Sequence, residues 1–192
     1  MSFSNNAVEV RVDYLRPEIV EKRTMIILAC AIPKKTKFET IIEKCTELGV
    51  DEIIPMLTQR TIVKVKGEDA KKKAARYQTV AINAAKQSNR TTVPHIHPVQ
   101  SFKEALKFLT EESFGLIPCL SEKERKDIGE IFRAITDPLR IIFFIGPEGD
   151  FTTEEISLAV KAGCLPVSLG ATVLKVDTAA ISAVSFARLN FS

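Results

Sequence analysis

Two glycine turns are the residues whose type and spacing best suit ligand binding. "FIGPEGDF" follows the apolar run "IIFFI" and carries Gly146 and Gly149, and "SLGATVL" follows a second apolar run and carries Gly170. Because glycine lacks a Cβ, its main-chain N–H and C=O groups can approach a flat, adenine-like group closely. The carboxyl ends of parallel strands, where both turns are predicted, are the usual ligand sites of open α/β sheets. The alternative is that both are simple strand-to-helix turns.

Other kinds of site find less support in the sequence. Neither of the phosphate-binding patterns G-x-G-x-x-G and G-x-x-x-x-G-K-[ST] occurs, and no G-x-S-x-G elbow marks a nucleophilic serine. The four cysteines are scattered without C-x-x-C spacing, and only two histidines are present. We therefore interpret the cysteines as reduced core residues and predict no metal site. A reaction that relies mainly on positioning the reactants fits best.

Composition indicates one ordinary folded chain. The 192 residues are 45% hydrophobic and 27% charged, which suits a single α/β core with at most a small appendage. No apolar run approaches the roughly 20 residues of a membrane-spanning helix. The N-terminus lacks the features of a secretory signal, so we expect a cytoplasmic protein. Lysine runs within residues 34–37, 64–66 and 71–76 suit either a nucleic-acid partner or solvated helix faces.

Strand-like runs alternate with helical patterns along the chain, which predicts a mainly parallel α/β sheet. Capping boxes at Thr36/Glu39, Ser101/Glu104 and Thr152/Glu155 mark helix starts. The strands are expected at residues 25–32, 52–57, 61–65, 114–120, 140–145 and 166–169. The helices are expected at residues 36–48, 69–87, 101–109, 124–135, 152–163 and 178–189. Pro55 suits the edge or the end of its strand.

The first 22 residues do not follow this alternation. They hold one strand-like stretch, "AVEVRVDYL", and too few other apolar residues for a core of their own. We expect either an extra edge strand of the sheet or the remnant of a second module.

Three segments, in this order and spacing, carry a family resemblance: "KFETIIEKCTELGVDEIIPMLTQRTIV", "AINAAKQSNRTTVPHIHP" and "FIGPEGDFTTEEISLAVKAGCLPVSLGATVLKVDTAAISAV". Over about residues 25–190 the chain resembles the bacterial RsmE-type ribosomal RNA uridine N3-methyltransferases of the SPOUT superfamily. The resemblance implies an α/β fold, a SPOUT-type mainly parallel sheet flanked by helices with a C-terminal deep trefoil knot. It also implies a methyltransferase domain at 23–192, preceded at 1–22 by the remnant of a PUA-like β domain.

The same resemblance implies a cofactor and a reaction. S-adenosyl-L-methionine is expected to lie bent in the knot, and its methyl group passes to N3 of a uridine in 16S ribosomal RNA. N3 lies on the Watson–Crick edge and carries a proton, so the base must be unpaired and a group must accept that proton. The expected partners are ribosomal RNA or the small ribosomal subunit and a second copy of the chain in a homodimer, with no membrane and no metal. The cofactor-binding residues implied are Leu120, Ile145, Gly146, Glu148, Gly149, Leu169, Gly170 and Leu174.

Two further sets of residues are implied. Lys175 and Asp177 lie in the loop where catalysis is expected. Gln87 and Arg90 of "QSNR" match the family's Q-S-x-R and are candidates for binding RNA or substrate near the cofactor; as an alternative, they cap the C-terminus of a helix.

The chain departs from the family pattern in both glycine turns. Asp150 stands where the family has a glycine, and Thr172 and Lys175 stand where it has arginines. Asp177 replaces a glutamate. Lysine keeps the charge but lacks the planar fork of arginine. These differences leave open a second function, a non-catalytic SPOUT domain that acts as an RNA-binding or ribosome-assembly module.

Overall fold

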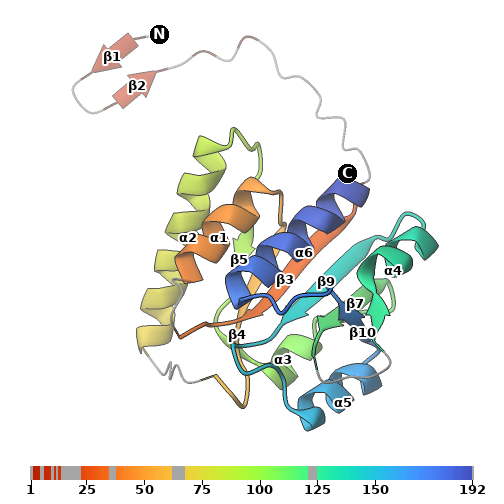
Figure 1. The fold of residues 1–192 in the computed structure, drawn as a ribbon. Helices are drawn as coiled ribbons and strands as arrows, with labels where there is room; N and C mark the ends of the chain where they lie inside the picture. Colours follow the sequence, from red (N-terminus) through yellow and green to blue (C-terminus); the bar gives the residue numbers. More distant parts are fainter. Residues whose placement is uncertain are drawn as a thin grey trace.

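The computed structural model describes residues 2–4, 7–9, 11, 13, 23–34, 38–61, 68–120 and 125–191. Strands and helices alternate along most of this length (Figure 1). The strands are β1 Ser2–Ser4, β2 Ala7–Glu9, β3 Met25–Ala31, β4 Glu52–Leu57, β5 His95–Ile96, β6 Gln100–Ser101, β7 Ser113–Pro118, β8 Lys126–Asp127, β9 Arg140–Ile145 and β10 Leu165–Ser168. The helices are α1 Phe38–Glu47, α2 Glu68–Gln87, α3 Phe102–Leu106, α4 Ile128–Ala134, α5 Thr153–Lys161 and α6 Val176–Asn190.

One parallel sheet organises the fold. Its order is β5-β4-β3-β9-β7-β10-β8, with β6 also paired to β4. Every recorded pairing within it is parallel, and β9 lies between β3 and β7, with Ile27 opposite Ile142 and Phe114 opposite Ile141. The predicted α/β class with a mainly parallel sheet is confirmed. The threaded path of a trefoil knot stays a prediction.

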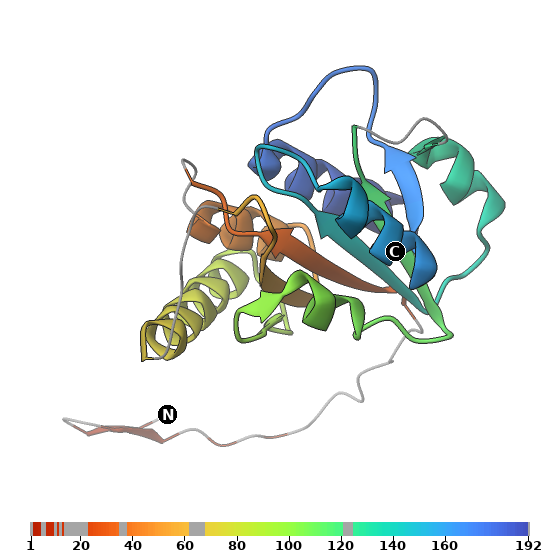
Figure 2. The ribbon, with the colours of Figure 1, turned by 90° about the horizontal axis from the view of Figure 1, so that it is seen from below.

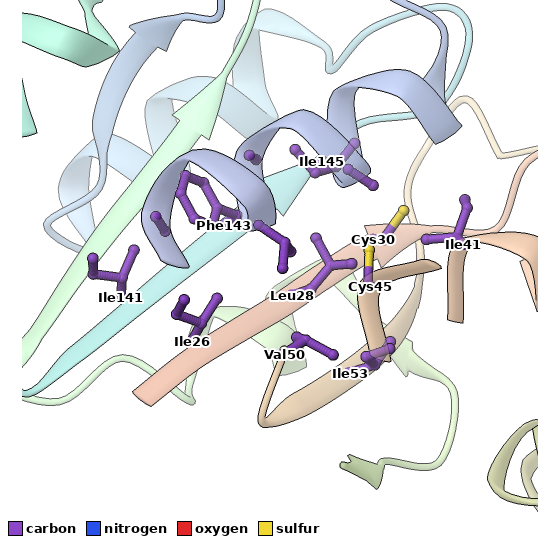
Figure 3. Packing of buried hydrophobic residues seen from close by; sticks show 14 of the residues in the cluster. Ile26, Leu28, Cys30, Ile41, Cys45, Val50, Ile53, Ile141, Phe143 and Ile145 are labelled. Carbon is purple, nitrogen blue, oxygen red and sulfur yellow. The ribbon is translucent and has the colours of Figure 1, made fainter. Parts of the chain in front are cut away.

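Side chains of the central strands alternate between two hydrophobic layers, because successive residues of a strand point to opposite faces. Leu28 of β3 and Phe143 of β9 belong to the layer that α1, α2, α4 and α6 cover (Figure 3). Ala29 and Phe144 belong to the layer that α3 and α5 cover. Figure 2 shows α3 and α5 on the face of the sheet opposite to α1 and α6. Burial on both faces explains why these strands read as nearly continuous apolar runs.

Several elements that were predicted from local sequence patterns are confirmed. β9 covers the predicted residues 140–145, and α2 ends at Gln87 as expected. Both halves of the capping box form at Ser101/Glu104 and at Thr152/Glu155. Gly49 and Gly163 follow α1 and α5 with φ of 95° and 96°, the left-handed conformation of a helix C-terminus. All four cysteines are buried, as expected for core residues.

Other expectations need correction. The helix predicted at 124–135 begins only at Ile128, because Asp127 is its N-cap and belongs to the short strand β8. Pro55 is not in an edge strand, since β4 pairs with β3 on one side. On its other side β4 pairs with β5 at Glu52–Ile53 and with β6 at Met56–Leu57, so Pro55 falls in the gap between two short partners. Thr36 and residues 62–65 of the predicted strand 61–65 lie outside the described residues.

The described N-terminal strands, β1 and β2, form a small sheet apart from the main sheet. β2, within the stretch "AVEVRVDYL", pairs antiparallel with β1, with Phe3 opposite Val8. The extra-edge-strand expectation is therefore wrong for the described part of this segment. Among the described residues no helix is both long and apolar enough to cross a membrane.

Candidate ligand pocket at the carboxyl end of the sheet

A pocket opens where three strands end. It encloses about 750 Å³, including space open to solvent. Its walls come from the end of β7 (118–120), from the turn after β9 (145–150) and from the segment that joins β10 to α6 (167–176). This position, at the carboxyl ends of strands whose order reverses around β9, is where open α/β sheets bind ligands.

The turn after β9 contains both glycines of the first motif, but they face different surroundings. A Cβ on Gly146 would lie 3.0 Å from two ring atoms of Phe151, so a larger residue would force the buried ring to shift by a few tenths of an ångström. Gly146 lines the pocket, whereas Gly149 does not; the space beside Gly149 is filled by the side chain of Arg60. Glu148 also lines the pocket, and its Oε1 accepts a hydrogen bond of 2.9 Å from the main-chain N of Lys34.

Two side chains outside the pocket lining, Arg60 and Glu155, hold this turn in place. The guanidinium of Arg60 donates to the carbonyl oxygens of Gly149 and Phe151. Glu155, only 3% exposed, accepts from the main-chain N of Gln59 at 2.8 Å and of Thr152 at 3.0 Å. The capping box thus also ties α5 to the segment that follows β4.

The wall at the end of β7 is held by two charged side chains. Oδ2 of Asp150 accepts a hydrogen bond of 2.8 Å from the main-chain N of Leu120. Nη1 of Arg125 donates to the carbonyl oxygens of Cys119 and Leu120 at 3.0 and 2.9 Å. Asp150 and Arg125 line the pocket, although the sequence indicated neither as a pocket residue. Asp150 stood out only as a departure from the family pattern, and Arg125 lay in a charged stretch without a motif.

The segment between β10 and α6 is open. Gly170 has φ of 126°, and a Cβ built on it would meet nothing within 4 Å. Its main-chain N donates to Oγ of Ser168 at 3.3 Å. Val173 is 74% exposed. Of the residues that the resemblance implies for the cofactor, those that line the pocket are Leu120, Ile145, Gly146, Glu148, Leu169, Gly170 and Leu174.

Lys175 and Asp177 lie beside the pocket and not in its lining. Lys175 is the exposed N-cap residue of α6, without a side-chain capping bond. Oδ1 of Asp177, in the first turn of the helix, accepts from the main-chain N of Thr178 at 3.0 Å. Leu174 and Val176, which alternate with these two residues, do line the pocket.

The buried thiol of Cys30 lies on the strand that ends beside Glu148. Burial raises the pKa of the Cys30 thiol well above its usual value, and the nearby Cys45, Asp177 and Glu148 raise it further. Cys30 is near the carboxyl end of β3 and lies beside Cys45 in the core (Figure 3). Glu148 is also tied to the residues that follow β3, because its Oε1 accepts from the main-chain N of Lys34.

Gln87 and Arg90 lie at the end of α2, and neither lines the pocket. Arg90 donates to the carbonyl oxygens of Thr46 and Val50 at 2.8 and 2.9 Å. Desolvation lowers the pKa of this half-buried guanidinium. Arg90 therefore caps the C-terminal end of α1, a neighbouring helix, which is a structural role close to the alternative raised from the sequence.

The fold and pocket together define an α/β domain with a nucleoside-sized site built largely from main-chain turns. A family model for the RNA methyltransferase domain matches residues 20–188. The chain belongs to this family, and the resemblance stated from the three sequence segments is confirmed.

Named relatives are similar to most of this chain. The small-subunit ribosomal RNA methyltransferase E of Synechocystis is 36% identical over 86% of this chain and 52% of its own length. The Bacillus subtilis protein of the same name is 35% identical over 84% of this chain and 65% of its own length. The chain thus spans about half to two thirds of these relatives.

A solved structure shows the same fold. The crystal structure of the methyltransferase E of Neisseria gonorrhoeae, bound to S-adenosyl methionine, matches with a TM-score of 0.76 and 35% identity. The match covers 85% of this chain and 65% of that chain.

Proposed function

We propose that this chain is an S-adenosyl-L-methionine-dependent RNA methyltransferase that methylates N3 of a uridine in 16S ribosomal RNA. The observation that carries the proposal is the pocket, because its walls come from the end of β7 and from the two glycine turns, at the carboxyl edge of a parallel sheet. A family member of the same fold binds this cofactor.

The described residues fit such a cofactor. The missing side chain of Gly170 leaves open space beside the main chain, and Ile145, Leu169 and Leu174 supply apolar surface for a flat base. The acidic side chains of Glu148 and Asp150 line the pocket, which suits a ligand that carries a sulfonium charge and an amino group. When bound, the cofactor supplies an electrophilic methyl group.

The roles proposed for this chain's own residues follow from their positions. Asp177, beside the pocket, would accept the N3 proton of an unpaired uridine. Lys175 projects from the N-terminus of α6, where its positive charge can hold the uridine phosphate or a carbonyl oxygen that gains negative charge. Main-chain groups of the two turns, together with the wall at Leu120, orient the cofactor so that the methyl group faces the base.

The remaining proposals concern the assembly. α6 is apolar around much of its circumference: Ala180, Ala183 and Val184 are buried, while Ile181 is half-buried and Leu189 is 80% exposed. A second copy of the chain packed on α6 would cover the outer residues, so we propose a homodimer. We also propose a cytoplasmic location, a methyltransferase domain at 23–192, a PUA-like remnant at 1–22 and a knotted C-terminal segment.

The test has two stages. Calorimetric titration with S-adenosylmethionine and S-adenosylhomocysteine should show saturable binding at about one site per chain. Transfer of labelled methyl groups to undermethylated small subunits or their RNA should then proceed, and Asp177→Asn should slow it by roughly 10²-fold without weakening cofactor binding. Asp137→Asn, a matched change outside the pocket lining, should leave the rate unchanged.

The outcomes separate two functions. Cofactor binding without methyl transfer, where an intact family member is active on the same RNA, would refute catalysis and favour the RNA-binding or ribosome-assembly function. The Lys175 and Asp177 loop would then be the place to look for the cause. Absence of cofactor binding by the wild-type chain would overturn the enzyme proposal outright.

A further inference from the structure

Asp150 has an unusual backbone conformation for its residue type. Its φ is 61°, and the other described non-glycine residues with positive φ are Asn89 and Asp137. Asparagine and aspartate tolerate this region better than other side chains because they can form hydrogen bonds with nearby main-chain groups. A non-glycine residue held in this conformation next to a ligand pocket is a reason to ask what its side chain does.

The carboxylate of Asp150 makes two main-chain contacts. Oδ1 accepts from the main-chain N of Phe151 at 2.9 Å, within its own turn. Oδ2 accepts from the main-chain N of Leu120 at 2.8 Å, thirty residues earlier in the chain. The first bond fixes the side chain and the second joins the turn after β9 to the wall at the end of β7. Hydrogen bonds from main-chain N–H groups to an ionised carboxylate are stronger than those between neutral groups.

Arg125 completes the arrangement from the other side of the same peptide segment. Its Nη1 donates to the carbonyl oxygens of Cys119 and Leu120. The main-chain N of Leu120 is thus held by an anion and its carbonyl by a cation. Cys119 is buried, and its main-chain N donates to the carbonyl oxygen of Val167 at 3.3 Å. The side chain of Leu120 is 51% exposed, so hydrophobic packing does little to fix this residue.

We propose that Asp150 is a positioning residue that orders Leu120, in the wall at the end of β7, before the cofactor binds. The proposal rests on the proposed function, since it assigns a role within the same pocket. A wall that is already ordered lets the ligand bind without the entropy loss of ordering a loop, which raises affinity. The main-chain N–H of Leu120 donates to Asp150 and is therefore not available to the cofactor. At this wall the cofactor would instead contact the carboxylate of Asp150, which can accept hydrogen bonds from hydroxyl or amino groups of the ligand.

The substitution that isolates this role is Asp150→Gly. Glycine adopts positive φ without strain, so the turn keeps its backbone while both carboxylate bonds are lost. Asp150→Asn is the conservative variant, because its single side-chain oxygen can replace one acceptor but not both. Asp137→Gly is the matched control: Asp137 has φ of 44° and does not line the pocket.

Two measurements on the full chain read out the proposal. Amide hydrogen exchange, followed by NMR without ligand, should be about tenfold faster or more at Leu120 in Asp150→Gly, and unchanged in Asp137→Gly. Calorimetry with S-adenosylhomocysteine should show roughly tenfold weaker binding for Asp150→Gly and a smaller loss for Asp150→Asn. The thermal midpoint of Asp150→Gly should stay close to that of Asp137→Gly, which separates positioning from a general loss of stability.

The contrary outcomes are distinct. Unchanged exchange at Leu120, or faster exchange with unchanged affinity, would overturn the positioning role while leaving the proposed function intact. If the wild-type chain bound neither ligand, the proposed function would fail and this proposal with it. If Asp150→Gly did not fold, Asp150→Asn would decide by the same two measurements.

Discussion

The two ends of the parallel sheet use charged side chains in different ways. At the amino end opposite charges meet: Asp51 pairs with Arg23 at 2.6 Å and with Arg188 at 2.9 Å, and the side chains of Asp51 and Arg188 are only 14% and 16% exposed. At the carboxyl end Asp150 and Arg125 hold one peptide segment from two sides and leave a pocket between the loops. The ion pairs at the amino end stabilise the fold, whereas the charged side chains at the carboxyl end position a wall of the pocket.

Substitution of Asp51, which pairs with both arginines at the amino end, should have the largest effect on the free energy of unfolding. Asp51→Ala leaves Arg188 with an uncompensated charge and removes the acceptor of the main-chain N of Ile26. Breaking a buried ion pair from one side costs about 3 kcal/mol or more. We expect that loss in the free energy of unfolding, measured by urea denaturation, with cofactor affinity of the folded protein unchanged.

An exposed pair provides the control for this prediction. Glu39 and Arg76 lie 2.9 Å apart, but the side chain of Arg76 is 69% exposed. Arg76→Ala should change the free energy of unfolding by less than about 1 kcal/mol. Equal losses in the two variants would contradict the distinction drawn for the amino end.

Substitution of Glu155, at the carboxyl end of the sheet, should have the second largest effect on the free energy of unfolding. Glu155→Ala leaves the main-chain N–H groups of Gln59 and Thr152 without their acceptor in a part of the structure where Glu155 is 3% exposed. The unfolding free energy should fall by about 2 kcal/mol, because buried donors are costly to leave unpaired. Glu104→Ala, in a capping box whose glutamate is exposed, should lose only about 1 kcal/mol in the same urea titration. A Glu155 loss no larger than that of Glu104 would mean that burial adds nothing at this site.

Gly170 tests whether an open loop is needed for the ligand. Gly170→Ala places a Cβ in the left-handed region at φ 126° and should lower the unfolding free energy by about 1 kcal/mol. Gly163→Ala, at φ 96° after α5, should cost a similar amount because both positions have free space around the new Cβ. Only Gly170 lines the pocket, so only Gly170→Ala should also weaken S-adenosylhomocysteine binding in calorimetry. Equal affinities in the two variants would show that the shape of this loop does not matter for the ligand.

The sequence predicted the elements whose signals are local. Residues 140–145 form a strand because 141–145 are apolar and buried on both faces, and α5 begins where Thr152 and Glu155 cap it. The same holds for Gly146, whose place at a strand end put it near the pocket. Each of these signals lies within a few residues of the feature that it predicts.

The sequence did not predict the features that depend on residues far away in the chain. The two-residue strands β5, β6 and β8 form because β4 and β10 provide pairing partners. Their own sequences are too short to show an alternation of apolar and polar residues that would predict a strand. Arg90 donates to the carbonyl oxygens of Thr46 and Val50, which lie 44 and 40 residues earlier in the chain. Asp150 reaches Leu120 across thirty residues. Such contacts follow from the tertiary fold and leave no mark in the local sequence.

The smallest effect is absent at neutral pH and concerns Cys164, at the amino end of β10. Burial raises the pKa of this thiol from 9.0 to about 12. The folded chain therefore keeps the thiol neutral while the unfolded chain ionises above pH 9, so stability is complete below pH 9 and falls as the pH rises toward 12. Between pH 7 and pH 10 the loss from this group should reach about 1 kcal/mol.

Urea unfolding in the presence of reductant at pH 7, 9 and 10 measures whether the free energy of unfolding falls as the pH rises. Cys164→Ala removes the ionisable group, so its stability should fall less than that of the wild type over the same range. Ending the series at pH 10 limits the contribution of Tyr77, whose pKa burial raises from 10.0 to about 12. Parallel pH profiles for the two proteins would contradict the prediction, because they would mean that Cys164 binds its proton equally well in the folded and unfolded chains.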